Sequence, residues 1–553
     1  MSSTTKAPRC DTHEVFNQSP PYVGVDLFQS DRPLRDAIAA NGLRGNEAAL
    51  SAFGKHWGSA QMADAARLAN ENRPKLNTFD DKGFRRDVVE FHPAYHQFMT
   101  ESIGAGMVAM TWTDKGARAA APAEVARAAR YYMIAQVENG HMCPVTMTRA
   151  AVGALANEPT LVARVMPKIS SRIYDQRFIP WTEKNGVTIG MGMTEKQGGT
   201  DVRANTTEAV PDGEGYRITG HKWFMSAPMC DMFLVLAQAP GGLTCLLMPR
   251  FEPDGKVNGM RFQRLKDKLG NISNASSEVE FCNAFAWRVG EEGRGVRTII
   301  DMVQLTRLDC AIASAGIMRG ALTHAVFHAR NRMVFQKKLA DQPLMATVLA
   351  DLALESEAAC AAVMRLSRSY DLAATDPKEA ARARTLTPVI KYWICKSAPG
   401  FVYEAMECLG GNGYVEEGTL ARLYREAPVN AIWEGSGNVV CLDLLRALMR
   451  DGDAAMAVLT ELAHATVALP GCTETVAYVT KTLGGEGAEA HARGAVERLA
   501  LLCAAEALQA SAPAVATTFA WARLANRFGR SYGAAELLAE DTSRLLERAL
   551  PSA

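Results

Sequence analysis

The residue with the best surroundings for chemistry is Glu434, near the end of residues 424–438. Two bulky apolar residues, Ile432 and Trp433, precede it, and a glycine–serine–glycine run follows it. A carboxylate beside that much apolar surface loses hydration, which makes it a better proton acceptor. Such a base can take a proton from carbon near neutral pH, and glycine lets backbone N–H groups approach a ligand closely. The alternative is a tight turn between two helices with a solvated glutamate, and this stretch alone does not separate the two.

Four other stretches carry small, hydroxyl-bearing, aromatic or basic residues in patterns that suit a phosphate-containing ligand. A loop rich in glycine and threonine can present backbone N–H groups and hydroxyls to phosphate and carbonyl groups. Each pattern alone is also typical of an ordinary structural turn, so only their combination is informative. The four stretches are residues 193–201, 220–227, 330–336 and 406–414.

The pattern of the chain changes along its length in a way that separates the elements carrying these stretches. Ala-rich segments with apolar residues three and four positions apart predict helices to about residue 180. Short runs of β-branched and aromatic residues between turn signals then predict a β-barrel or sandwich. The helical period returns at Gly295. We expect four domains: an N-terminal extension and helical domain (1–180), a β domain (181–294), a helical bundle (295–450) and an additional C-terminal helical domain (451–553).

Composition bounds the class of protein. The 553 residues are 48% hydrophobic and 22% charged with zero formal net charge, which is typical of a soluble globular protein with no global attraction to nucleic acid. Twelve cysteines without a C-x-x-C pair argue against structural zinc and suit a reducing cytosol. No apolar signal segment is visible at the start, so we expect a cytoplasmic protein. His92 and His96 lack a third ligand, so no metal site is expected.

Taken together, the five stretches resemble the acyl-CoA dehydrogenase family of flavoproteins. The motifs follow the family's order across residues 60–450, and residues 268–274 supply a further one. The resemblance implies an α+β multidomain fold: an N-terminal helical domain, a central β-barrel and a C-terminal four-helix bundle. A closer likeness, carried by residues 12–18, 192–199, 265–270 and 433–438 and by the added C-terminal module, is to the branch associated with the bacterial response to DNA alkylation.

The resemblance also implies that FAD lies between the β domain and the helical bundle. Ser226 would lie near flavin N5, and Arg332 and Phe335 would reach the cofactor of a neighbouring subunit, which requires a homo-oligomer, most simply a homotetramer. Thr194, Thr200 and Asn438 would contact substrate, and Arg446 is a candidate for binding an anion, either a DNA phosphate or the coenzyme A diphosphate of the substrate. The residues implied at the cofactor are Met191, Met193, Thr194, Gly199, Thr200, Phe224, Met225, Ser226, Ala227, Arg332, Phe335, Glu407, Gly410, Gly411, Ile432, Trp433, Gly435, Ser436 and Asn438.

Some positions depart from the family pattern. Phe224 stands where most relatives have tryptophan, which keeps an aromatic wall without the indole N–H. Gln336 replaces a glycine, so close backbone approach to a diphosphate is less easy there. Glu407 replaces a glutamine and brings a negative charge towards FAD, while Ser436 for threonine is a mild change. We expect FAD to bind, with Gln336 and Glu407 as the positions where affinity could suffer.

For the reaction, the resemblance implies α,β-dehydrogenation of an acyl-CoA thioester in fatty acid metabolism. Glu434 would take the α-proton, and flavin N5 would accept the hydride from the β-carbon. The backbone N–H of Glu434, with a ribityl hydroxyl, would hold the thioester oxygen and stabilise the developing enolate. An electron-accepting partner such as an electron-transfer flavoprotein would then be required.

The alternative function is a DNA-binding flavoprotein of the alkylation-damage response with weak or vestigial dehydrogenase activity. Duplex DNA is bound through clustered Lys and Arg, but residues 451–553 hold eight Lys+Arg against twelve Asp+Glu. Arg523, Arg527 and Arg530 are the exception, because their spacing places them on one helical face. Docking of the added module to a membrane surface ranks last, because no strongly basic amphipathic helix is visible.

Overall fold

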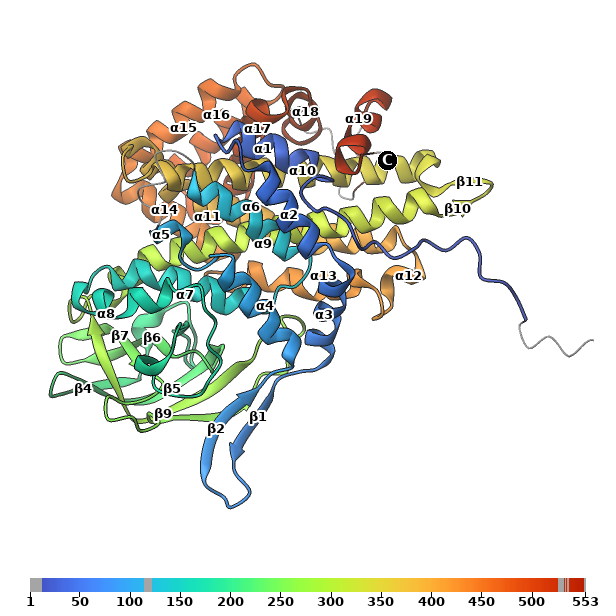
Figure 1. Cartoon of the computed structure of the whole chain (residues 1–553). Coiled ribbons are helices and arrows are strands. Elements are labelled where there is room, and N and C mark those ends of the chain that lie inside the picture. The colour runs from blue at the N-terminus through green and yellow to red at the C-terminus, as the bar shows by residue number, and fades with distance from the viewer. Residues whose placement is uncertain (1–11, 114–121, 526–531, 533, 535–536, 552–553) are drawn as a thin grey trace, which may run out of the picture.

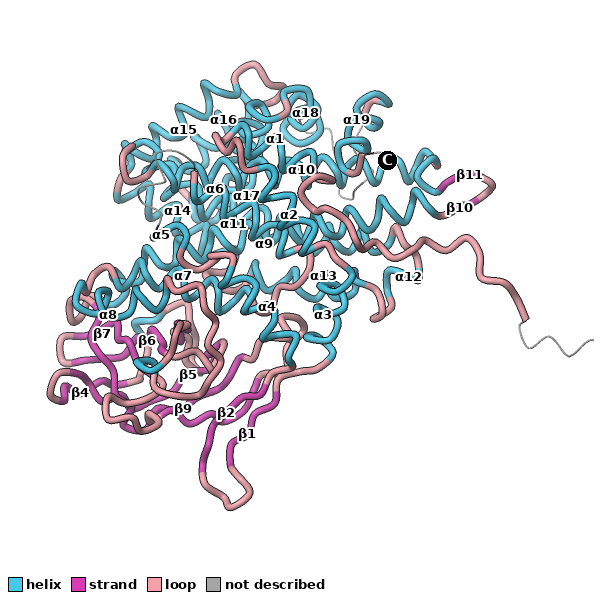
Figure 2. Tube along the Cα trace, viewed as in Figure 1, coloured by secondary structure: helices cyan, strands magenta, loops and turns pink. Residues whose placement is uncertain are grey.

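The computed structural model describes residues 12–113, 122–525, 532, 534 and 537–551. Within them, an N-terminal helical part leads through a β-barrel to two further helical parts (Figure 1; Figure 2). The barrel lies at one end of the molecule, and long helices fill the rest. This α+β arrangement confirms the fold class expected from the sequence.

The N-terminal part begins with an irregular segment, residues 12–31, that runs over the surface before the first helix. Asp31 caps that helix by accepting a hydrogen bond from the Leu34 N–H at 2.9 Å. The elements are α1 (Arg32–Ala40), α2 (Glu47–Trp57), α3 (Ala60–Glu71), β1 (Lys75–Phe79), β2 (Arg85–Glu90), α4 (Pro93–Gly104), α5 (Met110–Thr113), α6 (Ala123–Ala135), α7 (Met142–Leu155) and α8 (Pro159–Ile169).

The β domain is a closed barrel. Strand β6 pairs in parallel with β3 and β4 and antiparallel with β7, while β9 pairs antiparallel with β5, β7 and β8. With β4 beside β5, the pairings run from β6 around to β7 and back to β6, so few edges remain open. The elements are η1 (Trp181–Glu183), β3 (Ile189–Gly192), η2 (Val202–Ala204), β4 (Glu208–Asp212), β5 (Gly215–Ser226), β6 (Met232–Ala239), β7 (Gly242–Pro249), β8 (Met260–Leu265) and β9 (Ser276–Val289).

The third part is built on the central helix α9, which packs against α6, α7, α10 and α11. Of the helices that the structure describes, α9 alone is long and apolar enough to cross a membrane, yet 89% of its most apolar stretch is buried inside the protein. The elements are α9 (Gly295–Asn331), β10 (Met333–Val334), β11 (Lys337–Lys338), η3 (Leu339–Asp341), α10 (Pro343–Leu372), α11 (Pro377–Glu407), α12 (Gly411–Tyr414), α13 (Thr419–Glu426), η4 (Ala427–Ala431) and α14 (Gly437–Arg450).

The C-terminal module packs onto the third part mainly through α17, which contacts α10, α11 and α14. Its last helix, α19, returns to the beginning of the chain: Arg548 forms ion pairs with Glu357 at 2.5 Å and with Asp36 of α1 at 3.0 Å. The elements are α15 (Gly452–Thr466), α16 (Cys472–Gly484), α17 (Ala488–Ser511), α18 (Pro513–Phe519), the π-helical turn η5 (Ala520–Leu524) and α19 (Ala539–Ala549).

Two short hairpins interrupt regions for which the sequence predicts continuous helix. Strands β1 and β2 pair antiparallel within the first 180 residues, and β10 pairs with β11 between α9 and α10. The β1–β2 hairpin is rich in charged residues, so it lacks the apolar alternation by which half-buried strands are recognised. The hairpin at β10–β11 is only two residues a side and projects beyond the helices at one end of the molecule (Figure 1).

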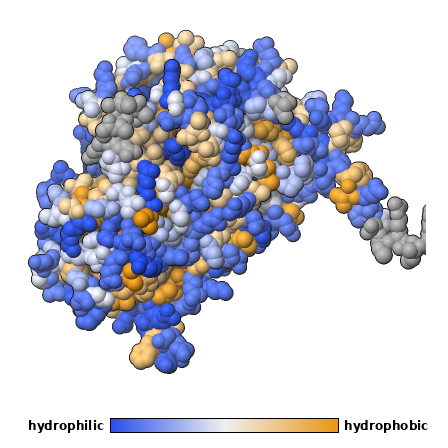
Figure 3. All heavy atoms as spheres, viewed as in Figure 1, coloured by the Kyte–Doolittle hydropathy of each residue, from blue (hydrophilic) through white to orange (hydrophobic). Residues whose placement is uncertain are grey.

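Buried apolar residues form one large cluster through the helical parts and a second inside the barrel. The surface is mostly hydrophilic, but apolar patches follow the side of the molecule where the N-terminal segment leaves (Figure 3). Large exposed apolar side chains in that segment and in the β10–β11 hairpin include Val15, Phe16, Met333 and Phe335. Of these exposed residues, Phe335 is one that the sequence analysis assigned to the cofactor of a neighbouring subunit.

Candidate functional site

Glu434 lies in the turn between η4 and α14, with its backbone in the left-handed region at φ +58°. That conformation costs a non-glycine residue roughly 1–2 kcal/mol, so the turn needs outside support. Arg307 Nε donates to the carbonyl of Glu434 at 2.8 Å, and Lys391 Nζ donates to the carbonyls of Trp433 at 2.9 Å and Gly435 at 2.6 Å. Two buried cations from α9 and α11 therefore hold the turn from both sides.

The carboxylate of Glu434 has one protein partner in the described structure. The hydroxyl of Thr306, on the buried side of α9, lies 2.7 Å from Glu434 Oε2 and 2.9 Å from the carbonyl oxygen of Val303. A hydroxyl carries a single proton, so it donates to one of these oxygens at a time. Thr306 thus fixes the direction of the carboxylate while leaving it half-buried rather than sealed.

A network of charged side chains surrounds this turn. Arg307 Nη2 contacts Asp443 at 2.5 Å, and Asp443 accepts a further bond from Arg446 at 2.9 Å. Arg493, on α17 of the C-terminal module, donates to the side chain of Asn438 at 2.8 Å. The added module therefore reaches the mouth of the Glu434 turn.

The loop after β3 is held rigidly by a buried ion pair. Glu195 contacts Lys222 at 2.8 Å and accepts the Thr206 N–H at 2.7 Å. Burial opposes the charge of Glu195, but the hydrogen bonds from Lys222, Thr207 and Thr206 outweigh it and lower its pKa to about 2. The ion pair fixes the backbone that carries Thr194 and Thr200.

Within that loop, Gly199 is required by close packing. A Cβ atom at this position would lie 2.2 Å from Thr194 Oγ1, and the carbonyl of Thr194 accepts the Trp223 N–H at 2.8 Å. Thr194 is half-buried and Thr200 is exposed. Both hydroxyls are therefore available at the barrel rim, as the sequence analysis expects, and both lie on a fixed loop.

Strand β5 ends with residues that alternate between two sides. Phe224 is 48% exposed and the Ser226 hydroxyl lies 3.1 Å from that of Ser276, whereas the side chains of Met225 and Ala227 are buried in the barrel core. Successive side chains of a strand point to opposite faces, so only Phe224 and Ser226 present side chains outward. That all four residues lie against a flavin ring stays a prediction; with their side chains buried, Met225 and Ala227 would do so through backbone atoms.

Three separate parts of the chain converge between the barrel and α14. Trp433 packs against the apolar core of the barrel. The buried thiol of Cys143, on α7, is hydrogen-bonded with Ser226 and feels the charge of Glu434, and burial raises its pKa to about 11. The structure therefore brings Ser226, Trp433 and Glu434 together, although 208 positions separate Ser226 from Glu434 in the sequence. Of the other expected residues, Met191 and Met193 are half-buried and Ile432 is 66% exposed.

Gly435, Ser436 and Asn438 follow Glu434 directly into α14, but five other cofactor candidates lie elsewhere. Arg332 and Phe335 belong to the β10–β11 hairpin, and Glu407, Gly410 and Gly411 lie in the neighbouring turn between α11 and α12 (Figure 1). From Thr306 to Arg332 the chain follows α9 for 26 residues, about 39 Å at 1.5 Å per residue. One cofactor molecule cannot contact both groups within a single chain.

The turn between α11 and α12 is open on its outer side. Neither Gly410, at φ +58°, nor Gly411 would bring an added Cβ within 4 Å of a neighbouring atom. Glu407 is exposed and forms a hydrogen bond with Tyr403, one helical turn earlier. The negative charge that the sequence analysis flagged at Glu407 is thus partly engaged by a tyrosine hydroxyl.

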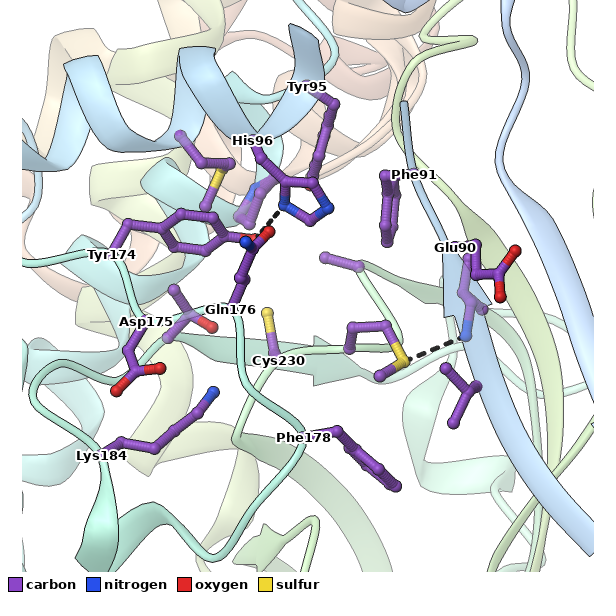
Figure 4. Close-up of a pocket in the computed structure, with 17 residues that line it drawn as sticks. Glu90, Phe91, Tyr95, His96, Tyr174, Asp175, Gln176, Phe178, Lys184 and Cys230 are labelled. Atoms are coloured by element: carbon purple, nitrogen blue, oxygen red, sulfur yellow. Dashed lines mark hydrogen bonds between the residues drawn. The ribbon is translucent and has the colours of Figure 1, made fainter. Parts of the chain in front are cut away.

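A cavity of about 220 Å³ lies behind the end of β5, between the β2 region, α4 and the loop before β3 (Figure 4). Its wall includes Tyr95, whose ring stacks on that of Phe91 with 4.3 Å between the ring centroids. His96 is also part of the wall, and its Nδ1 lies 3.0 Å from Tyr174 Oη. Ala227 closes one side, while Glu434 is not part of the wall. The cavity is therefore separate from the Glu434 carboxylate. His92 serves a different purpose from its neighbour, because it caps α4 by accepting the Ala94 N–H.

Of the three C-terminal arginines considered for DNA binding, the structure describes Arg523. Arg523 is 6% exposed and is paired with Asp351 at 2.6 Å and with Glu355 at 2.9 Å on α10. A guanidinium fixed between two buried carboxylates is a structural group and cannot present its charge to DNA. Arg527 and Arg530 lie outside the described residues.

Several site residues were missed by the sequence analysis: Thr306, Arg307, Lys391 and Arg493. The signal available for the first two is a threonine–arginine pair inside an otherwise apolar helix, because buried polar residues require partners. Lys391 gives the same signal within α11. Arg493 gives none, since an exposed arginine on a helix is ordinary.

Known proteins are similar to this chain over most of its length. Three family models match: "Adaptive response protein AidB N-terminal domain" over residues 17–176, "Acyl-CoA dehydrogenase, middle domain" over 190–284, and "Acyl-CoA dehydrogenase, C-terminal domain" over 293–449. The chain is 48% identical over 441 residues to the Escherichia coli protein named "Putative acyl-CoA dehydrogenase AidB", which covers 79% of this chain and 80% of that protein.

Solved structures give the same result for the fold. The Caenorhabditis elegans protein ACDH-11 in complex with C11-CoA has a TM-score of 0.81 at 25% identity, covering 99% of this chain and 94% of that one. An acyl-CoA dehydrogenase complexed with FAD from Bacillus anthracis has a TM-score of 0.64 at 16% identity, with 83% and 80% covered. The second likeness is one of fold alone.

Proposed function

Because the chain belongs to the acyl-CoA dehydrogenase family of FAD-dependent oxidoreductases, in the branch of AidB, we propose that it dehydrogenates an acyl-CoA thioester with Glu434 as the base. One observation carries this proposal. Glu434 is held in a strained turn by Arg307 and Lys391, with its carboxylate oriented by Thr306, beside the outward end of β5. Backbone strain that persists under such support is typical of functional positions.

The residues at this place fit FAD on observations from the structure. Phe224 and Ile432 leave large apolar surfaces exposed beside the Glu434 turn, as an aromatic ring system requires. The loop with Thr194 and Gly199 presents hydroxyls and backbone at the barrel rim. Bound there, FAD would supply the acceptor for the hydride that leaves the β-carbon of the substrate.

The proton has a defined destination. When Glu434 is ionised, the Thr306 hydroxyl donates to Oε2; when Oε2 has taken the α-proton, it donates to Thr306, whose own proton turns to the Val303 carbonyl. Thr306 thus keeps a hydrogen bond to Glu434 in both protonation states. Thr306 therefore lowers the free-energy cost of protonating and deprotonating Glu434, and the carboxyl group keeps its position.

The developing negative charge on the thioester oxygen also has a donor. The backbone N–H of Glu434 makes no hydrogen bond within the described part of the chain, so it is available to that oxygen. For the coenzyme A portion we propose Thr194 and Thr200 at the barrel rim and Arg446 near the turn, whose side chain is 56% exposed. Asn438 would act together with Arg493, its hydrogen-bond partner.

We further propose a homotetramer in which Arg332, Phe335, Glu407, Gly410 and Gly411 contact the cofactor of a neighbouring copy. The separation of about 39 Å along α9 supports this arrangement, because one chain cannot bring both groups to one cofactor. An electron-transfer flavoprotein as partner, a role in fatty acid metabolism and a cytoplasmic location belong to the same proposal.

The alternative of a DNA-binding flavoprotein in the alkylation response has less support. It depends on a basic face on the C-terminal module, and Arg523 is buried between Asp351 and Glu355. We therefore rank dehydrogenation first. Salt-sensitive binding of duplex DNA in a gel-retardation assay, with an affinity as high as that for acyl-CoA, would rank DNA binding above dehydrogenation.

Anaerobic titration with a series of acyl-CoAs tests the proposal. Wild type should contain oxidised flavin, and a preferred acyl-CoA should bleach it. Glu434→Gln should retain flavin and lose bleaching, whereas Glu417→Gln, an exposed carboxylate at a distance in α12–α13, should bleach normally. Unchanged bleaching in Glu434→Gln would remove Glu434 as the base, and wild type that cannot bind FAD would refute the proposal as a whole.

A further inference from the structure

We propose that Asn17, in the N-terminal segment, is a positioning residue that aims Arg332 at the cofactor of the neighbouring copy. The proposal rests on the function proposed above, because it takes Arg332 as a ligand of that cofactor. It assigns a role to residues 12–18, a sequence stretch that no catalytic step uses. This segment precedes α1 by more than a dozen residues and lies against the far end of α9 (Figure 1).

Asn17 closes a two-bond clamp on the hairpin. Its side-chain Nδ2 donates to the carbonyl of Met333 at 2.9 Å, and its Oδ1 accepts the Met333 N–H at 2.7 Å. Its own main-chain carbonyl accepts from Arg332 Nη1 at 2.5 Å. One residue therefore fixes both the backbone beside Arg332 and the guanidinium itself.

The residue type is specified by this geometry. Asn17 has φ +55°, a left-handed conformation that asparagine adopts more readily than most residues. Glycine would accept the backbone conformation without supplying the amide, and aspartate would face the Met333 carbonyl with an acceptor instead of a donor. Only an asparagine at this position provides the conformation, the donor and the acceptor at once.

The guanidinium that results keeps its charge available. Within the described residues, Arg332 forms no ion pair with a carboxylate, and its guanidinium donates a hydrogen bond to the neutral Asn17 carbonyl. A guanidinium held on one side by a carbonyl retains N–H groups for an anion such as a diphosphate. The orientation is thus obtained without neutralising the charge.

The same segment also touches the second cofactor element. Gln18 Oε1 lies 3.4 Å from Asn412 Nδ2, next to the Gly410–Gly411 turn. At the hairpin tip, Phe335 and Gln336 both have positive φ, at 49° and 67°. Two strained non-glycine residues in succession need support from outside the hairpin, and the Asn17 clamp supplies it at Met333, two residues before Phe335.

Flavin affinity, rather than activity, tests the proposal. Apoprotein is titrated with FAD and the quenching of flavin fluorescence is followed for wild type, Asn17→Gly, Arg332→Gln and the double variant. Asn17→Gly should weaken FAD binding by up to about tenfold, because an Arg332 side chain that is no longer held beforehand must be ordered when FAD binds. In the Arg332→Gln background the same change should have no further effect, because its consequence passes through Arg332.

Ser19→Ala serves as the matched control, since among the described residues the Ser19 hydroxyl forms a hydrogen bond only with the carbonyl of Pro20. The thermal midpoint of each apoprotein and its size by light scattering are measured in parallel. Additive effects of Asn17→Gly and Arg332→Gln, or a lower midpoint with unchanged FAD affinity, would show a merely structural role. Loss of FAD only through dissociation of the oligomer would also overturn the positioning role.

The proposed function and the positioning role of Asn17 can be refuted separately. If wild type does not bind FAD, the proposed function is wrong. If wild type binds FAD and Asn17→Gly binds it equally well, the function stands and only the positioning role of Asn17 is refuted.

Discussion

Replacing Glu426 by glutamine should remove a pH-dependent loss of stability near the active turn. Glu426 is buried at the end of α13, and its Oε1 accepts the Asn271 N–H at 2.7 Å. Burial and the nearby charge of Glu138 raise its pKa from 4.5 to about 7, against the lowering effects of Asn271 and Lys268. Its second oxygen, Oε2, has no hydrogen-bond partner in the described structure. Glu426 is therefore poorly suited to being charged.

The magnitude follows from the shift. Between pH 4.5 and 7 the folded protein holds a proton on Glu426 that the unfolded chain releases, so folding stability falls as pH rises through this window. At 1.36 kcal/mol per pKa unit the loss reaches at most about 3.4 kcal/mol and is complete above pH 7. Glutamine keeps an acceptor for Asn271 and cannot ionise, so Glu426→Gln should escape this loss.

The assay is the thermal midpoint of wild type and variant from pH 4.5 to 8.5. If the chain unfolds as one unit, entropy of ~2.1 cal/mol/K per residue makes the relative gain of the variant about 3 °C between the ends of the range. Glu417→Gln, an exposed neighbour in sequence, should follow wild type. Midpoints for Glu426→Gln and wild type that run parallel across the range would refute the reasoning.

Three further outcomes are expected. Thr306→Val keeps the shape of the side chain but removes the hydroxyl 2.7 Å from Glu434 Oε2, so the rate of flavin bleaching by acyl-CoA in stopped flow should fall 10- to 100-fold, as a charged hydrogen bond of about 1.5–3 kcal/mol implies; an unchanged rate contradicts it. Gly199→Ala places a Cβ 2.2 Å from Thr194 Oγ1, so the purified protein should retain less flavin, and full retention would show that the loop yields easily. Arg523→Gln leaves Asp351 and Glu355 without their buried counter-charge and should destabilise the protein by about 3–5 kcal/mol, measured by denaturant unfolding, with no effect attributable to DNA.

Much of the fold and part of the site followed from sequence. The motifs around Thr194, Ser226 and Glu434 combine residue types that few contexts explain together, and the structure brings Ser226 and Glu434 to one place. The sequence did not show which side chains of residues 224–227 are buried, and the structure places those of Met225 and Ala227 in the barrel core. Local pattern identifies a strand, but which face is buried depends on partners far away in the sequence.

The burial of Arg523 could not be read from the sequence for the same physical reason. Helical spacing places Arg523 on a face, yet whether that face meets solvent depends on Asp351 and Glu355, about 170 residues earlier. Lys391 shows the reverse case: its two carbonyl partners at the Glu434 turn lie more than 40 residues later. Long-range pairing of this kind leaves no periodic signal.

The contact between α19 and α1 also constrains how the protein is made. Asp36 meets Arg548 across 512 positions, and Arg330 of α9 meets the carbonyls of Leu546 and Leu550. On the ribosome, the N-terminal helices emerge and begin to fold long before residue 548 is added. The buried carboxylate of Glu357 on α10 lacks its Arg548 counter-charge until then, so α19 completes its packing against α1 and α10 only after both have been translated.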